Sequence, residues 1–203
     1  MPLLLINAKA RLILAHGAGA SCDSPFMTEL ATALTHHNIA VKCFNFPYMQ
    51  RSIEQAGKRP PDKMPVLLQS FIQQIELAPK DLPLFIGGKS MGGRVASMLN
   101  PADIQGIFAF GYPFHPPGKQ QWRTAHFASL SAPLYIVQGE RDPFGKVSEL
   151  ASQSWNGVDL HWLSAADHDF KPTKASGLTQ QQLIADAAGY CSERIDEILL
   201  AGH

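Results

Sequence analysis

The segment Gly88-Lys89-Ser90-Met91-Gly92 constrains the fold of this chain more than any other feature of its sequence. It fits the pattern G-x-S-x-G and stands between a short apolar run and a stretch with helical periodicity. A serine on a very tight turn between a strand and a helix needs glycine on both sides, because a Cβ atom there would collide with the neighbouring strand and helix. Such a turn lifts the hydroxyl out of the sheet and places it at a helix N-terminus, where backbone N–H groups face developing negative charge. The sequence therefore predicts a strand, a sharp turn that presents Ser90, and a helix.

Short apolar runs alternate with helical patterns along the rest of the chain. The predicted strands are residues 11–15, 39–44, 82–86, 107–110, 133–137 and 160–163. The predicted helices are residues 25–38 with Ser24 as the capping hydroxyl, a helix carrying the apolar positions Val66 to Ile75, residues 91–99, and a C-terminal helix that opens with the capping-box pair Thr179 and Gln182. The polar, proline-containing segment 45–63 predicts a loop. This alternation predicts a three-layer α/β/α sandwich around a mostly parallel sheet, with the functional residues beyond the carboxyl ends of the strands.

Length and charge limit the classes of function. At 203 residues, the chain is expected to form a single domain over residues 1–203. Its 17 basic and 17 acidic residues cancel, so we expect no nucleic-acid and no membrane partner. The apolar patch of residues 1–7 precedes Lys9 and Arg11, which is the wrong order for a secretory signal. Three widely spaced cysteines imply neither a disulfide framework nor a metal cage, so we expect a cytoplasmic protein.

A serine hydroxyl becomes a good nucleophile only when a base removes its proton. For a serine on such a turn, the acid and the histidine are expected later in the chain, each on a loop that follows a strand. Asp142 comes directly after strand 133–137, and His168 comes shortly after strand 160–163. Glu140 on the first of these loops is an alternative acid. Four other histidines fit less well, because they precede Asp142 or lie within a strand: His16, His115, His126 and His161.

Stabilising the oxyanion that forms when a carbonyl is attacked needs two preorganised N–H donors. One is expected from Met91, the residue after the serine, and the other from the glycine-rich segment 16–20 after the first strand. We expect the second donor to be the Ala18 amide, with Gly17 as the next choice. An ordinary glycine turn is the simpler alternative for this segment. His16 is expected to orient the loop and not to transfer protons.

The walls of the substrate pocket are harder to read from sequence. The candidates are His16, Tyr48, Lys89, Tyr112, Phe114 and His115. Tyr48 belongs to the loop 45–63, which also carries Arg51, Lys58 and Arg59. The positive charges of Lys89 and Arg94 leave open a negatively charged substrate, although solvated loop charges are the simpler interpretation.

Six blocks of sequence together resemble a known family. They are LAHGAGA, FNFPY, GGKSMGGR, GYPFHPPGK, QGERDPFG and ADHDF, and the resemblance extends from about Leu12 to Leu199. Together they look like the small capless bacterial α/β-hydrolases of the dienelactone-hydrolase-like branch, and more closely like the subgroup related to the eukaryotic testis-expressed and chromatin-complex hydrolase-like proteins. The resemblance implies a minimal α/β-hydrolase fold without a cap domain, with Ser90, Asp142 and His168 as the catalytic triad. Dienelactone hydrolase itself has a cysteine nucleophile where this chain has Ser90, so its lactonase activity is not implied.

The function expected from these residues is that of a serine hydrolase, carboxylesterase-like or thioesterase-like, acting on small esters or thioesters as a monomer or homodimer. It needs no metal and no organic cofactor. A scaffold that kept the fold without turnover is the alternative, since eukaryotic relatives include proteins thought to act in that way. A phosphate-binding loop is disfavoured because Pro83 stands where that motif needs glycine. A metal site is disfavoured because the adjacent His36 and His37 face different sides of a helix.

Overall fold

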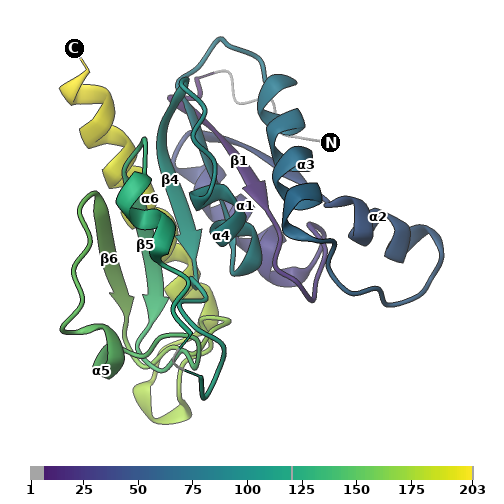
Figure 1. Cartoon of the computed structure of the whole chain (residues 1–203). Helices are drawn as coiled ribbons and strands as arrows, with labels where there is room; N and C mark the ends of the chain where they lie inside the picture. The colour runs from purple at the N-terminus through teal and green to yellow at the C-terminus, as the bar shows by residue number, and fades with distance from the viewer. Residues whose placement is uncertain (1–6, 120, 203) are drawn as a thin grey trace.

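A parallel sheet forms the centre of the molecule in the computed structural model, which describes residues 7–119 and 121–202. Six strands pair in the order β2-β1-β3-β4-β5-β6, and every neighbouring pair is parallel (Figure 1). They are β1 (Ala10–Ala15), β2 (Ile39–Phe44), β3 (Leu84–Lys89), β4 (Ile104–Phe110), β5 (Leu134–Gly139) and β6 (Val158–Leu163). All six predicted strands are present. The strand β3 extends beyond its predicted end because Gly87 and Gly88 still pair with β1 and β4.

Helices cover both faces of this sheet, so the predicted three-layer sandwich is confirmed (Figure 1). The helices are α1 (Pro25–His36), α2 (Pro47–Glu54), α3 (Met64–Glu76), α4 (Met91–Ser97), α5 (Val147–Leu150) and α6 (Gln180–Ala201). Two short 3₁₀ turns span Ala125–Ser129 and Lys174–Ser176.

Alternating residues of the strands divide the core into two halves, because successive strand side chains point to opposite faces. Ile13 and Ile86 pack under α3 and α4, whereas Leu14 and Phe85 pack under α1 and α6. The sandwich therefore fixes the carboxyl ends of all six strands at one edge, where the loops that follow them meet.

Two local predictions were wrong. The segment 45–63 is not a loop throughout, because Pro47 begins α2; proline is favoured in the first turn of a helix, where its missing N–H costs nothing. This helix and the chain after it extend away from the sandwich (Figure 1). Ser24 occupies the N-cap position of α1 but makes no capping hydrogen bond, and its Oγ is buried without a partner among the described residues. The capping box of Thr179 and Gln182 at the start of α6 is confirmed.

None of the helices in the described ranges is long and apolar enough to cross a bilayer. The apolar patch of residues 1–7 lies outside the described residues apart from Asn7.

Candidate active site

Ser90 lies on a sharp turn between the end of β3 and the start of α4. Its backbone angles are φ 50° and ψ −112°, a conformation that residues with a side chain rarely adopt. Its N–H donates a hydrogen bond of 3.0 Å to the carbonyl oxygen of Phe110 at the end of β4. Backbone strain of this kind costs about 1–3 kcal/mol and persists only where the surrounding structure imposes it.

Close backbone approaches explain the glycines on either side of this turn. A Cβ atom on Gly88 would lie 2.5 Å from the carbonyl carbon of Gly92 and 2.6 Å from the carbonyl oxygen of Ala15. A Cβ atom on Gly92 would lie 2.6 Å from the carbonyl oxygens of both Ala15 and His16. The collision with the neighbouring strand and helix that the sequence predicts is therefore found in the structure.

Ser90, His168 and Asp142 form one hydrogen-bonded line. Ser90 Oγ is 2.9 Å from His168 Nε2, and His168 Nδ1 is 2.7 Å from Asp142 Oδ2. Asp142 lies on the turn after β5 and His168 on the loop after β6, so three segments that are far apart in sequence meet at the carboxyl edge of the sheet. Because a carboxylate only accepts hydrogen bonds, Asp142 keeps the imidazole proton on Nδ1 and leaves Nε2 free to accept from the serine hydroxyl.

The carboxylate of Asp142 is completely buried, and its remaining hydrogen bonds come from its own loop and strand. Its Oδ1 accepts the Phe144 N–H at 2.9 Å, and its Oδ2 accepts the side-chain amide of Gln138 at 2.9 Å. Sequence reasoning missed Gln138. The available signal was a polar residue near the end of the otherwise apolar strand 134–139, because a buried polar side chain needs partners.

The alternative acid and the alternative histidines have other partners. Glu140 accepts the backbone N–H of Ala165 at 2.7 Å and so holds the start of the loop that carries His168. The four alternative histidines contact Phe46 and Gly17 (His16), Pro116 and Glu149 (His115), Ser97 (His126) and Asp186 (His161).

Backbone N–H groups beside Ser90 come from the segment after β1 and from Met91, the first residue of α4. The amide N–H groups of Gly17, Ala18 and Met91 have no hydrogen-bond acceptor within residues 7–119 and 121–202, so the structure does not single out one of the two candidates in this segment. The buried Tyr48 hydroxyl donates to the carbonyl oxygens of Ala18, at 3.0 Å, and of Gly17, at 3.3 Å, and so supports this segment from inside the protein.

His16, which is buried, orients the same segment from the side of the core. Its Nε2 accepts the N–H of Phe46 at 3.1 Å, so its proton resides on Nδ1, which donates to the carbonyl oxygen of Gly17 at 2.6 Å. Burial lowers the pKa of His16, although the bond to Gly17 opposes this shift. A neutral imidazole that makes both bonds is suited to hold the loop.

A cavity of about 400 Å³ lies beside Ser90 and His168. It is lined by Gly17, Ala18, Gly19, Ala20, Ser24, Phe26, Met27, Lys89, Ser90, Phe144, His168 and Asp169. Two larger cavities, of about 690 and 820 Å³, are lined by other parts of the surface and include none of Ser90, His168 and Asp142. The smaller cavity is thus the one that a substrate of Ser90 would occupy.

Only one of the six predicted wall residues lines this cavity. It is Lys89, whose side chain is 7% exposed, so the interpretation of Lys89 as a solvated loop charge was wrong. Tyr112 and Phe114 pack inside the core, because their rings contact each other and Phe127.

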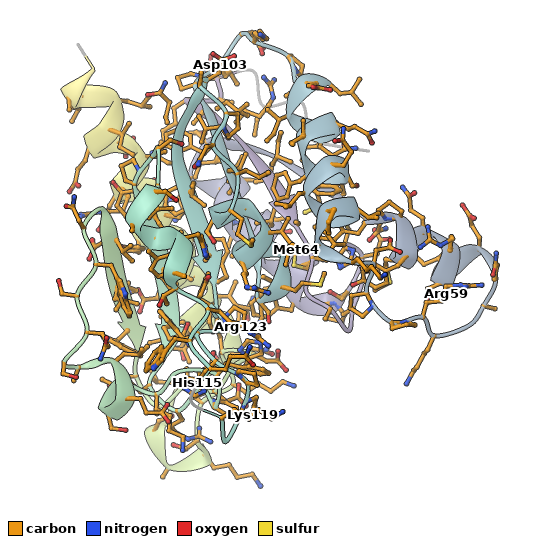
Figure 2. The ribbon with its side chains drawn as sticks, viewed as in Figure 1. Arg59, Met64, Asp103, His115, Lys119 and Arg123 are labelled. Carbon is orange, nitrogen blue, oxygen red and sulfur yellow. The ribbon has the colours of Figure 1, made fainter. Side chains whose placement is uncertain are left out.

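The remaining wall candidates do not line the cavity and make contacts that support the surrounding loops. Tyr48 and His16 are buried behind the Gly17–Ala18 peptide. His115 lies among the loops at the carboxyl end of the sheet (Figure 2), but its Nε2 is 3.2 Å from Glu149 and its ring does not line the cavity. Arg59 lies in the segment after α2, which extends away from the sandwich (Figure 2), and its side chain donates a hydrogen bond to Gln55. The described residues contain no group of three or more histidine, cysteine, aspartate or glutamate side chains placed to hold a metal ion.

Comparison with known proteins agrees with this architecture. A family described as alpha/beta hydrolase domain matches residues 8–196. The fold is similar to that of Est1E from Butyrivibrio proteoclasticus with ferulic acid bound, at 12% identity and a TM-score of 0.70, over 98% of this chain and 93% of that one. It is also similar to dienelactone hydrolase from Anabaena variabilis ATCC 29413, at 19% identity and a TM-score of 0.67, over 93% of this chain and 86% of that one. An alpha-beta serine hydrolase homologue from Coxiella burnetii matches at 17% identity with a TM-score of 0.66, over 90% and 85% of the two chains. At these identities the likeness establishes the fold alone.

Proposed function

The chain belongs to the alpha/beta hydrolase domain family, and from this membership and the geometry at Ser90 we propose that it is a serine hydrolase of small carboxylic esters or thioesters. One observation carries the proposal: the Ser90–His168 and His168–Asp142 hydrogen bonds, 2.9 and 2.7 Å long, are both formed. A scaffold does not need a serine that is held in a strained conformation and hydrogen-bonded to a histidine. This observation therefore favours a hydrolase over a scaffold.

The first half of the reaction transfers the acyl group to the serine. His168 Nε2 takes the proton of Ser90 Oγ as the oxygen attacks the carbonyl carbon, and Asp142 stabilises the imidazolium that results. The N–H groups of Met91 and Ala18 stabilise the oxyanion of the tetrahedral intermediate. His168 then gives its proton to the leaving alcohol or thiol, and the acyl–Ser90 ester remains.

The second half releases the acid. Water enters the place of the leaving group, and His168 Nε2 takes one of its protons as the oxygen attacks the acyl carbon. Collapse of the second tetrahedral intermediate returns the proton from His168 to Ser90 Oγ. The reaction consumes one water and yields a carboxylic acid without any cofactor.

The size of the cavity favours small substrates. About 400 Å³ lies near the lower end of the range of ligand pockets. One structure with this fold holds ferulic acid, a small carboxylic acid, which fits a product of the proposed reaction. Within the family, we propose that the chain belongs to the subgroup related to the eukaryotic testis-expressed and chromatin-complex hydrolase-like proteins, and that residues 1–203 form a single domain.

Labelling with a fluorophosphonate probe tests the proposal directly, because the electrophilic phosphorus of such a probe reacts readily with an activated serine and very slowly with an ordinary one. The wild type is expected to become labelled, and Ser90→Ala and His168→Ala are expected to abolish labelling without unfolding the protein. A folded wild type that resists the probe, or a Ser90→Ala variant that is still labelled, would rule out the assignment. A panel of p-nitrophenyl esters and acyl thioesters of increasing chain length would then define the acyl group.

A further inference from the structure

A buried ammonium joins the two segments that carry Ser90 and His168. Lys89 is the last residue of β3 and directly precedes Ser90. Its Nζ donates a hydrogen bond of 2.7 Å to the carbonyl oxygen of His168. This contact links the turn that carries Ser90 to the backbone of His168, the residue whose ring takes the Ser90 hydroxyl proton in the proposed reaction.

Gly111, the first residue after β4, leaves the space in which this contact forms. It has a φ of 71°, and a Cβ atom there would lie 3.0 Å from Lys89 Nζ and 3.1 Å from the carbonyl oxygen of His168. The same Cβ atom would lie 3.3 Å from His168 Nδ1. The ends of β3 and β4 and the loop after β6 therefore converge on the ammonium.

The loop that carries His168 is strained. Ala165 and Phe170 have φ values of 56° and 60°, although both carry side chains. The Phe170 ring is buried, and with Phe26 of α1 it flanks the Lys89 ammonium, with ring centres 5.9 and 5.3 Å from Nζ. A strained backbone keeps its conformation only where its surroundings determine it, and the ammonium is one such constraint.

Carboxylates face the ammonium from the loops around it. Asp169 Oδ1 is 3.7 Å from Nζ, and the charges of Asp142 and Asp167 also favour the protonated amine. Lys171, whose Nζ is 3.8 Å from Asp169, faces the same carboxylate from the solvent side. Burial outweighs these charges and lowers the pKa of Lys89 to about 8. Lys89 therefore loses its charge in weakly alkaline solution, and a hydrogen bond from a charged donor is roughly twice as strong as one from a neutral donor.

We propose that Lys89 is a positioning residue for His168, and that its charged form keeps the imidazole in line with Ser90 Oγ. The inference rests on the proposed function, since the alignment matters to catalysis only where Ser90 is the nucleophile. A displacement of about 1 Å at reacting atoms can cost about 100-fold in rate. Lys89 would thus affect the chemical step through the position of a backbone carbonyl.

The test is the alkaline limb of the kcat profile for p-nitrophenyl acetate, corrected for spontaneous hydrolysis, in four proteins. In the wild type, kcat is expected to fall about tenfold or more above pH 8. Lys89→Met is expected to lower kcat by about 10- to 100-fold at pH 7, with KM changed less than about threefold, and to have no alkaline limb. Lys89→Arg keeps its charge throughout, so it should recover part of kcat and also lose the limb. Lys171→Met, an exposed lysine beside the same Asp169, is the matched control and should keep the wild-type profile.

A wild-type profile in Lys89→Met, or an alkaline limb that survives in both Lys89 variants, overturns the inference. A second measurement is independent of turnover, namely the ¹H NMR resonance of His168 Nδ1–H. Its shift should change with a midpoint near pH 8 in the wild type and should show no such change in Lys89→Met. If the wild type hydrolyses nothing and resists the fluorophosphonate probe, the proposed function has failed, and the resonance alone decides whether Lys89 positions His168.

Discussion

The side-chain amide of Gln138 donates a hydrogen bond to Asp142 Oδ2, the same oxygen that receives His168 Nδ1. The amide oxygen of Gln138 accepts the N–H of Tyr112 at 2.7 Å, and because a backbone N–H only donates, this bond fixes the orientation of the amide. Gln138 thus connects the end of β4 with the acid that orients the histidine.

Replacing Gln138 by leucine is expected to lower kcat/KM for an activated ester about tenfold. The carboxylate of Asp142 loses one of its fixed donors, and the buried N–H of Tyr112 loses its acceptor, which costs about 1–3 kcal/mol in the free energy of unfolding. Urea denaturation and steady-state kinetics on the same preparation measure both effects. A variant that loses stability but keeps full kcat/KM would show that Gln138 supports the fold without orienting Asp142.

Removing the side chain of Ser90 is expected to stabilise the protein while it abolishes turnover. Ser90 has a φ of 50°, and glycine adopts such angles without the steric cost of a Cβ atom. We therefore expect Ser90→Gly to raise the free energy of unfolding by about 1 kcal/mol. Ser90→Ala keeps the Cβ atom and is the matched control, inactive but without the gain. Equal stabilities of the two variants would mean that the turn is not strained.

Gly92 and Gly189 offer a matched pair of substitutions to alanine. A Cβ atom on Gly92 would lie 2.6 Å from two carbonyl oxygens, so Gly92→Ala must displace β1 or α4 and should destabilise the protein by about 3 kcal/mol. A Cβ atom on Gly189 in α6 has nothing within 4 Å, and Gly189→Ala should stabilise the protein by about 0.5–1 kcal/mol because alanine favours the helix. Thermal unfolding of both variants measures the contrast, and destabilisation of similar size in both would contradict it.

Much of the fold follows from local patterns. Each predicted strand is an apolar run, and a parallel sheet buried on both faces requires such runs. The six strands and the three-layer arrangement could therefore be predicted. The positions of Ser90, Asp142 and His168 follow from the same logic, because each lies on a turn or loop that follows a strand and the carboxyl ends of parallel strands share one edge.

The surroundings of Ser90 could not be predicted in this way. Tyr112 follows a strand just as Asp142 does, but its side chain turns into the core, and only tertiary packing decides that direction. Gln138 and Lys89 acquire their importance from contacts with the segments after β4 and β6, which local sequence does not specify. The helix α2 was not predicted, because its polar residues are typical of a loop and Pro47 fits a loop as well as it fits the first residue of a helix.

The stability of the protein is expected to rise over the same pH range in which Lys89 loses its charge. Burial lowers the pKa of Lys89 to about 8 from an ordinary value of 10.5, so between these values the unfolded chain binds a proton that the folded chain has released. Under that condition the free energy of unfolding rises with pH, and for this one group the gain is about 2 kcal/mol between pH 8 and pH 10. Well below pH 8 both states hold the proton and the contribution is constant.

Lys89→Met isolates this contribution, because every other titrating group is common to the two proteins. The difference in the free energy of unfolding between wild type and Lys89→Met, from urea denaturation at several pH values, should shift in favour of the wild type from pH 8 to pH 10. A structural lysine whose charge held the fold together would give the opposite slope. Rising stability together with falling kcat over the same pH range would therefore indicate a lysine that positions His168 and not one that merely stabilises the loop. A difference in the free energy of unfolding that does not change with pH would show that the ammonium is not desolvated.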